Sequence, residues 1–311
     1  MAYEQKYAED KRMSLKEAIK KFVHDGCTLG LGGMASYVTF QVSYEIIRQK
    51  KKDLILIAPA PTADVDMLIG AGLVKKLETA YLGGGIFGYA PNFRRALEEG
   101  YPGRIEIEEY SNYTMGLRYL AGSMGIPFIP TKSLLGSDIP KHNKRIKIID
   151  DPYTGEPLAL VPAANPEVAI LHVHRADKFG NAQIFGILVN HGEIARAAEH
   201  TIITCEEIVS SEEIRRFPNL TAIPFYCVDA VVEVPYCCHP LNMPYYYVED
   251  IVFESSYYKQ ARTKEGFLKW LEEWCYSCED WRDYCRKVGW ERLWELTRLE
   301  RLFNRFEEAL L

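Results

Sequence analysis

Apolar residues near the start of the chain recur at helical spacing and then give way to short runs that end at glycine. Residues 14–26 carry an apolar face, with Ser14 and Glu17 spaced as a capping box and Gly26 as a stop signal. The apolar run Thr28 to Leu31 follows and ends at Gly32-Gly33. The pattern predicts a helix, a short buried strand and a glycine turn.

The same alternation continues through most of the chain. Short β-branched or aliphatic runs predict strands at 54–57, 77–82, 104–108, 127–130, 168–173, 201–205 and 228–234. Helical patterns lie between several of them, at 64–72, 94–99, 113–124 and 206–217. Buried strands that alternate with helices predict an α/β fold with a mostly parallel sheet flanked by helices.

The character of the sequence changes from Cys237 onward, where tyrosine, tryptophan and charged residues dominate. Residues 263–285 and 291–311 have helical patterns. We therefore expect a single domain over residues 1–311 that includes a helical C-terminal extension at 241–311. The polar, proline-bearing segment 140–157 is the one candidate for a linker.

Charge and composition narrow the class of protein. The chain has 311 residues, of which 48% are hydrophobic, and a net charge of −6 that offers no basic surface to a nucleic acid. The N-terminus is polar and acidic, so we expect no signal peptide, and no apolar stretch suits a membrane span. Eight scattered cysteines are typical of reduced thiols, which favours the cytoplasm.

Two glycine-rich segments follow predicted strands, where backbone amides can approach a ligand closely. They are Gly30-Leu31-Gly32-Gly33 and Gly83-Gly84-Gly85-Ile86-Phe87-Gly88. Neither matches the dinucleotide-binding G-x-G-x-x-G pattern with its later acid, and neither contains the lysine of a P-loop. A dinucleotide or nucleoside triphosphate site is therefore disfavoured.

Acidic and sulfur-containing residues raise two further possibilities. Glu206-Glu207 could hold a catalytic glutamate, but acids in the first turn of a helix at 206–217 are explained by the helix dipole. Cys205 beside them has no histidine partner in the sequence that would make it a nucleophile. We expect it to be a core thiol.

A structural zinc site is the other possibility. Cys275 and Cys278 are spaced for one helix face, but no second pair completes four ligands, although Cys285 and Cys237-Cys238-His239 are also present. His172 and His174 share one face of a predicted strand and have no third ligand close in sequence. We expect buried thiols, ordinary histidines and no metal.

Several ordered blocks resemble the α subunit of family I coenzyme A transferases of the glutaconate CoA-transferase type. The similarity extends from about Ser14 to His239, and the aromatic C-terminal helices also look like that subunit's tail. The blocks that carry it are 25–34, 90–100 (Ala-Pro-Asn-Phe-Arg-Arg-Ala-Leu-Glu-Glu-Gly), 109–118, 125–131, 135–138, 177–181, 201–207 and 228–232.

The resemblance implies a ping-pong reaction in which an acyl-CoA thioester is attacked by a glutamate of a separate β subunit, through an anhydride and then a glutamyl-CoA thioester. It implies that CoA is a substrate, that no cofactor is bound permanently, that the acyl group is dicarboxylic and that the enzyme is a hetero-oligomer, α2β2 or larger. The chain departs from the family at Met34-Ala-Ser-Tyr-Val-Thr-Phe40, near the site in relatives. Which acyl group the enzyme transfers is therefore left open.

Other chemistries occur in relatives of this subunit pair. In ring-opening hydrolases an α-subunit glutamate takes part where this chain has Asn112, which cannot act as a base. Decarboxylation of a glutaconyl-type CoA ester remains an alternative, because the residue that distinguishes a decarboxylase from a transferase belongs to the partner subunit. A non-catalytic scaffold role is the last alternative.

The resemblance also suggests residues that line a cleft shared with the partner, with no catalytic residue in this chain. Ser137 and Asp138 are expected to follow a strand at Leu134-Leu135 and to lie at the carboxyl edge of the sheet. The alternative for each residue is a turn or a helix cap. The candidates are Gly32, Gly33, Met34, Gly84, Gly85, Asn92, Arg94, Ser111, Asn112, Ser137 and Asp138.

Overall fold

The computed structural model describes the backbone of residues 9–308 and the side chains of residues 9–303. Most of the polar N-terminal segment considered above lies outside the described residues, as do residues 309–311. Within the described part, no helix has both the length and the apolar character that a bilayer span requires.

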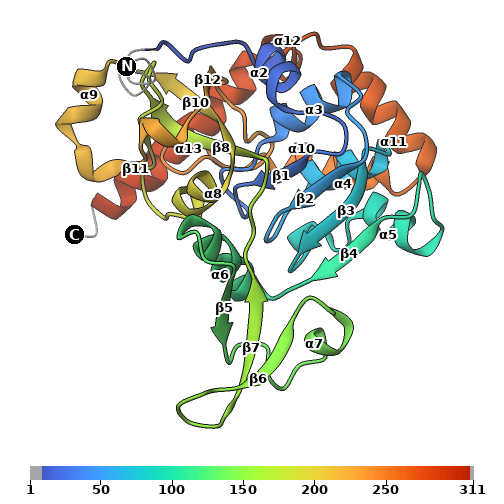
Figure 1. The fold of residues 1–311 in the computed structure, drawn as a ribbon. Helices are drawn as coiled ribbons and strands as arrows, with labels where there is room; N and C mark the ends of the chain where they lie inside the picture. The colour runs from blue at the N-terminus through green and yellow to red at the C-terminus, as the bar shows by residue number, and fades with distance from the viewer. Residues whose placement is uncertain (1–8, 309–311) are drawn as a thin grey trace.

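A mostly parallel sheet forms the centre of the molecule, with helices on its faces (Figure 1). Its parallel strands run in the order β12-β10-β8-β1-β2-β3-β4, and β9 and β11 add antiparallel pairs beside β8. The bounds are β1 (Thr28–Leu31), β2 (Leu54–Ile57), β3 (Val74–Thr79), β4 (Glu106–Glu109), β8 (Val168–Ala176), β9 (Ala182–Gln183), β10 (His200–Ile208), β11 (Thr221–Ile223) and β12 (Ala230–Glu233). The predicted fold class is confirmed.

Helices follow most of the parallel strands, as the alternating pattern predicted. Their bounds are α2 (Leu15–Phe22), α3 (Phe40–Arg48), α4 (Ala63–Gly70), α5 (Pro91–Glu98), α6 (Asn112–Ser123), α8 (His191–Ala197) and α9 (Ser211–Arg216). The capping box at the start of α2 is present, because Ser14 Oγ accepts the Glu17 N–H at 3.2 Å and Glu17 Oε2 accepts the Ser14 N–H at 2.9 Å.

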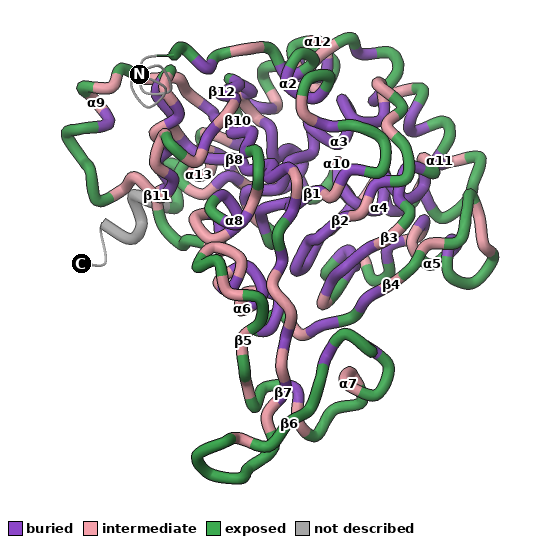
Figure 2. The backbone as a smooth tube through the Cα atoms, in the orientation of Figure 1, coloured by how far each residue is buried: buried purple, intermediate pink, exposed green. Residues whose placement is uncertain are grey.

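A small antiparallel sheet, β5-β7-β6, projects below the main sheet in Figure 1. It consists of β5 (Phe128–Thr131), β6 (Lys147–Asp150) and β7 (Pro157–Pro162), with the short helix α7 (Ile139–His142) beside it. Figure 2 shows that this projection is mostly exposed, whereas the main sheet is buried. The segment 140–157 is therefore not a linker, because it forms α7, β6 and the hairpin that leads to β7.

The C-terminal part is helical and packs against helices α3, α4 and α5. It contains α10 (Ile251–Ala261), α11 (Lys264–Leu271), a π-helical turn (Glu272–Tyr276), α12 (Trp281–Val288) and α13 (Trp290–Glu308). The predicted continuous helix at 263–285 is wrong, since it breaks before Asp280, whose side chain caps α12. Helix α10 was not predicted because its buried positions include Glu254, Tyr257 and Tyr258 rather than an aliphatic stripe.

The predicted helix at 206–217 is also wrong at its start. Strand β10 continues through Glu206 and Glu207 to Ile208, and Glu207 pairs with Arg175 of β8. Helix α9 begins only at Ser211. The long register with β8 outweighs the local preference of two glutamates for a helix start.

Candidate functional site at the carboxyl edge of the sheet

Three of the predicted glycine and polar segments meet at one edge of the main sheet. Strands β1, β2, β3 and β4 are parallel neighbours, so the loops that follow them leave from the same side. The predicted residues on these loops are Gly32, Gly33 and Met34 after β1, Gly84 and Gly85 after β3, and Ser111 and Asn112 after β4.

The loop after β1 requires both glycines. A Cβ on Gly32 would lie 2.5 Å from Leu171 Cδ2, and Gly33 has a φ of +94° with the carbonyl oxygen of Ser36 2.9 Å from where its Cβ would be. Met34 follows with its side chain 44% exposed. The turn is therefore tight on its inner side and presents an adaptable apolar side chain on its outer side.

The loop after β3 is built in a similar way. A Cβ on Gly84 would lie 2.4 Å from the ring of Tyr258, and Gly85 has a φ of +56°. A 3₁₀ turn, η1 (Gly85–Phe87), follows, and Phe87 stacks on Tyr258 with ring centroids 5.2 Å apart. Helix α10, which the sequence did not predict, therefore fixes the position of this loop.

The loop after β4 leads directly into α6. Ser111 is the N-cap residue: its Oγ accepts the Thr114 N–H at 3.2 Å, and Thr114 Oγ1 accepts the Ser111 N–H at 2.9 Å. Asn112 is the first residue of the helix and is exposed. The Ser111 side chain thus has a capping role, which was the alternative for this residue, while Asn112 faces solvent at the helix N-terminus.

Asn92 and Arg94 lie on α5 in different surroundings. The side chain of Asn92 is fully buried and donates to Asp66 Oδ2 at 3.0 Å and to the Tyr257 hydroxyl at 3.2 Å. Arg94 pairs with Glu98 at 2.8 Å and lines a surface pocket of about 560 Å³ together with Tyr89 and Arg262. The Asn92 side chain thus connects α5 with α4 and α10, whereas the Arg94 side chain is accessible to solvent.

Ser137 and Asp138 lie in the projecting part of the molecule. The strand predicted at Leu134-Leu135 is wrong, since residues 133–136 form a turn between β5 and α7. This part is attached to the carboxyl edge, because Asn143 Nδ2 donates to the carbonyl oxygen of Glu109 at 2.9 Å. Ser137 Oγ donates to the carbonyl oxygen of Leu134, and Asp138 pairs with Lys141 at 2.6 Å on the surface.

A buried charge network lies beneath the loops after β3 and β4. Glu78 and Glu108 are direct neighbours across these two strands. Arg118 Nη2 contacts Glu78 Oε2 at 2.5 Å, and Lys76 contacts Glu78 at 2.9 Å and also pairs with Glu108. Burial raises the pKa of Glu78, but Arg118 and Lys76 outweigh it, so the net shift of this pKa is downward.

Tyr110 completes this network on its outer side. Its hydroxyl donates to Glu108, and its ring packs against the Arg118 guanidinium at 4.0 Å. Burial and the Glu108 contact raise its pKa well above the usual value, despite Arg118. The base of the edge is therefore a rigid, charge-balanced platform.

Glu206 is part of a second buried network and is not the start of a helix. Its Oε1 is 2.9 Å from His172 Nε2 and accepts the Tyr247 hydroxyl at 2.7 Å, while its Oε2 accepts the Tyr236 N–H at 2.8 Å. Nothing in the sequence indicated that Glu206 is the carboxylate partner of His172, because the two residues are 34 positions apart in the chain. With both oxygens engaged inside the protein, Glu206 is a structural carboxylate.

His191 is a residue of this edge that the sequence reasoning missed. It is the first residue of α8, it is fully buried, and its ring lies against Tyr37 with centroids 5.2 Å apart. Burial lowers its pKa to about 4, and burial also lowers the pKa of His174 to about 4. The rings of His174 and His191 are therefore neutral at pH 7. No local sequence pattern indicated that these two histidines lie close together.

Carboxylates are missing from the loops after β1, β2 and β3, from residues 110–111 after β4 and from segment 184–190, whereas Asp177 follows β8 on the other half of the edge. Segments 32–38, 58–62, 80–90, 110–111 and 184–190 contain no Asp or Glu. The last of them reaches the loop after β1, because the Tyr37 hydroxyl donates to the carbonyl oxygen of Phe185 at 3.0 Å. Glu109, the exposed last residue of β4, is the carboxylate next to these loops in sequence.

Apolar side chains are exposed on these loops and at the start of α6 instead. For Met34, Ile86 and Tyr89 the sequence offered a signal, because each follows a predicted strand in a segment without charges. The exposed residues are Met34, Tyr81, Ile86, Tyr89, Tyr113, Ile187 and Leu188. A surface of this kind is typical of a protein interface.

The C-terminal cysteines considered for zinc are buried among protein groups. Cys275 Sγ is 3.5 Å from the carbonyl oxygen of Tyr44, and Cys238 Sγ is 3.9 Å from Met243 Sδ. Burial raises the pKa of Cys275 to about 12. The expectation that they bind no metal stays a prediction.

Comparisons with known proteins bear on this arrangement. The family model described as Coenzyme A transferase matches residues 12–234. One subunit of the 3-oxoadipate CoA-transferase of Pseudomonas knackmussii is 38% identical over 89% of this chain and 98% of that protein. An uncharacterized protein of Archaeoglobus fulgidus is 44% identical over 95% of this chain, but the match spans only 66% of that protein's own length.

Two solved structures extend the comparison. The glutaconate CoA-transferase of Acidaminococcus fermentans superimposes with a TM-score of 0.85 at 35% identity, covering 92% of this chain and 95% of that chain. In sequence, the matching subunit of that enzyme is 36% identical over 91% of this chain and 93% of its own length. A variant of the decarboxylase AibA/AibB superimposes with a TM-score of 0.72 at 29% identity, covering 84% of this chain and 97% of that chain.

The family model spans the main sheet, and the matches to the glutaconate CoA-transferase cover 91% of this chain in sequence and 92% in structure. Together with the family model, they agree with the resemblance carried by the ordered sequence blocks. The chain therefore belongs to the coenzyme A transferase family, as an α-subunit type of the family I enzymes.

Proposed function

We propose that this chain is the α subunit of a heteromeric CoA-transferase that moves CoA between an acyl-CoA and a free carboxylate, with the catalytic glutamate on a β subunit. The observation that carries this proposal is the lack of carboxylates in the loops after β1, β2 and β3, in residues 110–111 after β4 and in segment 184–190.

The buried acids Glu78, Glu108 and Glu206 are engaged by internal partners. Burial and Glu249 raise the pKa of the buried Glu254 of α10 to about 9, so this acid is protonated at pH 7. We infer that a nucleophilic carboxylate comes from another chain.

The carboxyl edge of the sheet has features that suit an active site shared between two subunits. Its exposed Met34, Ile86 and Tyr113 would be covered by the β subunit, which would exclude water from an anhydride intermediate.

Backbone N–H groups at the start of α6 could stabilise the oxyanion formed when the glutamate attacks the thioester. In the glycine loops, the N–H groups of Gly32 and Gly84 already donate to the carbonyl oxygens of Ile170 and Gly88. The rest of the predicted cleft remains part of this proposal, with Asn92 in a supporting position.

The reaction keeps the acyl group activated throughout. The partner's glutamate attacks the thioester carbonyl and releases the CoA thiolate, which leaves an anhydride. The thiolate then attacks the glutamyl carbonyl and releases the first carboxylate, so that the enzyme holds a glutamyl-CoA thioester. The second carboxylate reverses these steps. We propose a dicarboxylic, glutaconyl-like acyl group, because of the similarity to a glutaconate CoA-transferase.

The test is reconstitution from separately purified subunits. We expect this chain alone to show no exchange between acyl-CoA and free carboxylate, and the complex to be active with a borohydride-sensitive thioester on the β subunit. Glu109→Gln should leave the rate of the complex within about three-fold, corresponding to less than about 1 kcal/mol in the transition state. Robust turnover by this chain alone, or loss of activity in Glu109→Gln, would contradict the proposal.

The same reconstitution experiment distinguishes CoA transfer from a second candidate function, decarboxylation. The structural similarity to the decarboxylase AibA/AibB favours decarboxylation of a CoA ester as the alternative. Release of CO2 without transfer of CoA by the reconstituted complex would favour that chemistry. A complex that assembles but supports neither reaction would instead favour a scaffold role.

A further inference from the structure

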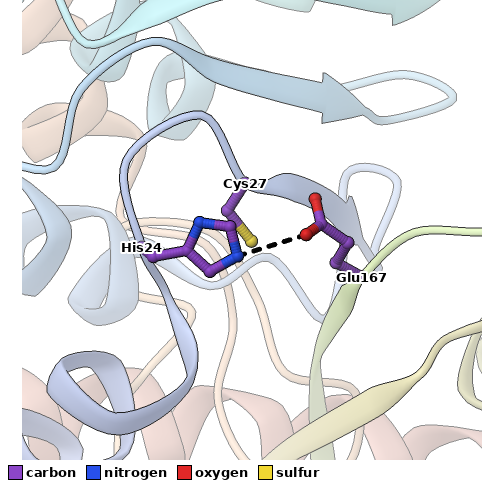
Figure 3. Close-up of side chains that lie close together, drawn as sticks. All are labelled: His24, Cys27 and Glu167. Carbon is purple, nitrogen blue, oxygen red and sulfur yellow. Dashed lines mark hydrogen bonds and ion pairs between the residues drawn. The ribbon is translucent and has the colours of Figure 1, made fainter.

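The opposite edge of the sheet contains a cluster of three side chains that the CoA reaction does not use. His24 and Cys27 lie in the turn between α2 and β1, and Glu167 lies directly before β8 (Figure 3). Strands β1 and β8 are parallel neighbours, with Leu29 opposite Val168, so their N-terminal ends lie side by side. Residues from distant parts of the chain therefore meet at one place.

The potential ligand atoms of these side chains converge. One imidazole nitrogen, one thiol sulfur and one carboxylate oxygen all lie within 4.8 Å of one another, and among the described residues this is the one such group found. His24 Nε2 is 3.1 Å from Glu167 Oε1. Figure 3 shows the Cys27 sulfur directed toward the His24 ring, on the side that faces Glu167.

The hydrogen bonds behind the cluster orient the ligand atoms. His24 Nδ1 lies 3.0 Å from the carbonyl oxygen of Asp25, to which it can only donate, so Nδ1 carries a proton. In the neutral ring the lone pair of Nε2 then faces Glu167 Oε1. Glu167 Oε2 accepts the Thr28 N–H at 2.8 Å, which leaves Oε1 directed at the histidine. Backbone partners of this kind are typical of metal ligands.

A lone pair that faces a carboxylate oxygen at this distance needs a positive charge between the two atoms. That charge is either a proton on Nε2, which makes an ion pair, or a bound cation. The Cys27 sulfur favours the cation, because a thiolate is a preferred ligand of borderline-soft metals. In the structure the Cys27 thiol is buried and contacts the carbonyl oxygen of Thr28 at 3.9 Å.

We propose that His24 Nε2, Cys27 Sγ and Glu167 Oε1 form a binding site for a divalent transition metal of the zinc type. In a tetrahedral zinc site with bonds of about 2.0–2.3 Å, ligand atoms lie about 3.5 Å apart, so a small rotation of exposed side chains completes the geometry. The side chains of His24 and Glu167 are 63% and 39% exposed, which leaves them free to adjust and keeps a fourth position open to water.

Binding forms a metal–sulfur bond and releases the Cys27 thiol proton to solvent, together with any proton on Nε2. The metal would hold the turn after α2 against the start of β8. This inference is independent of the proposed CoA chemistry, which takes place at the other edge. It also departs from the sequence expectation of no metal, which considered only the C-terminal cysteines and the pair His172 and His174.

The test uses the full chain after treatment with a chelator and dialysis. Zinc binding is measured by calorimetry, and cobalt is used as a spectroscopic probe of thiolate ligation. We expect one zinc per chain, a thiolate-to-cobalt charge-transfer band and a higher melting temperature with zinc. Cys27→Ser should abolish the band, and His24→Gln and Glu167→Gln should each weaken zinc binding about 100-fold or more.

Matched controls replace the same residue types elsewhere. Cys278→Ser and His142→Gln should leave zinc stoichiometry and affinity unchanged. His24 is exposed and Glu167 is half-buried, so their variants keep the test valid even if Cys27→Ser does not fold. Zinc affinity that is the same in His24→Gln and Glu167→Gln as in the unmodified chain, or the lack of stoichiometric zinc binding, would overturn the proposal and identify the cluster as an ion pair beside a buried thiol.

Discussion

The two edges of the parallel sheet differ in chemistry although the same strands form both. At the carboxyl edge, glycine loops expose Met34, Tyr81 and Ile86 and contain no carboxylate. At the amino edge, His24, Cys27 and Glu167 direct a nitrogen, a sulfur and an oxygen at one point. The carboxyl edge thus supplies backbone groups and an apolar surface, and under the proposed function the reactive side chain belongs to a partner. The amino edge instead brings donor atoms of this chain's own side chains together.

The largest effect is expected from the buried charges beneath the carboxyl edge. Arg118→Met leaves Glu78 with one buried cation fewer while its carboxylate stays buried. Loss of one member of a buried ion pair costs about 3–5 kcal/mol, so the free energy of unfolding should fall by that amount in urea denaturation. The control is Arg94→Met, which removes an exposed pair with Glu98 and should cost about 0.5 kcal/mol or less. Equal losses would mean that the network beneath the edge is not a charge-balanced platform.

Glycine turns at the two edges allow a direct comparison. Gly33 has a φ of +94° and carbonyl atoms within 2.9 Å of an added Cβ, whereas Gly26 has a φ of +77° and nothing within 4 Å. Gly26→Ala should therefore cost only the backbone penalty of about 1–2 kcal/mol. Gly33→Ala should cost at least about 1 kcal/mol more, because the loop must shift away from its own carbonyl groups. It should also lower kcat/KM of the reconstituted complex, and equal stability of the two variants would show that the loop after β1 is not constrained.

The smallest effect concerns pH. Burial lowers the pKa of His191 to about 4, below the value of about 6.5 expected in the unfolded chain. A lowered pKa means that its contribution is complete above pH 6.5 and is lost as the pH falls toward 4, since the unfolded state then binds the proton more readily. Between pH 6.5 and 5.5 the loss should be about 1 kcal/mol.

The matched variants for this prediction are His191→Leu and His142→Gln. His191→Leu removes the buried ring, so its unfolding free energy should depend less on pH than that of the unmodified chain. His142 is exposed on α7, and its replacement should leave the pH profile unchanged. Identical pH profiles for all three proteins would contradict the assignment of a buried neutral histidine at the carboxyl edge.

Much of the fold followed from local patterns. The strands at 28–31 and 54–57 were predicted with their observed bounds, because short aliphatic runs between turn residues have few other solutions. The start of α2 was predicted because the capping box lies entirely within four residues. The errors at 206–217 and 263–285 arose where contacts distant in sequence, or a break between helices, outweighed local propensity.

The site was predictable to a smaller degree. The glycine loops were recognised because a turn after a strand has a local signature. The partners of His172 and His24 were not, because Glu206 and Glu167 are 34 and 143 residues away from them. Asn92 was a candidate for the cleft, but its side chain is occupied by Asp66 and Tyr257, which only the packing of α4, α5 and α10 could show.

The sequence by itself determined the alternation of strands and helices, the positions of the glycine turns and the family, since each depends on residues close together in the chain. The tertiary structure decided which carboxylates are engaged internally, which apolar residues are exposed at the carboxyl edge and which donors meet at the amino edge. The physical reason is that parallel strands bring loops from distant parts of the chain to a common edge. The charge, burial and ligand geometry of a side chain depend on those neighbours and not on the residues beside it in sequence.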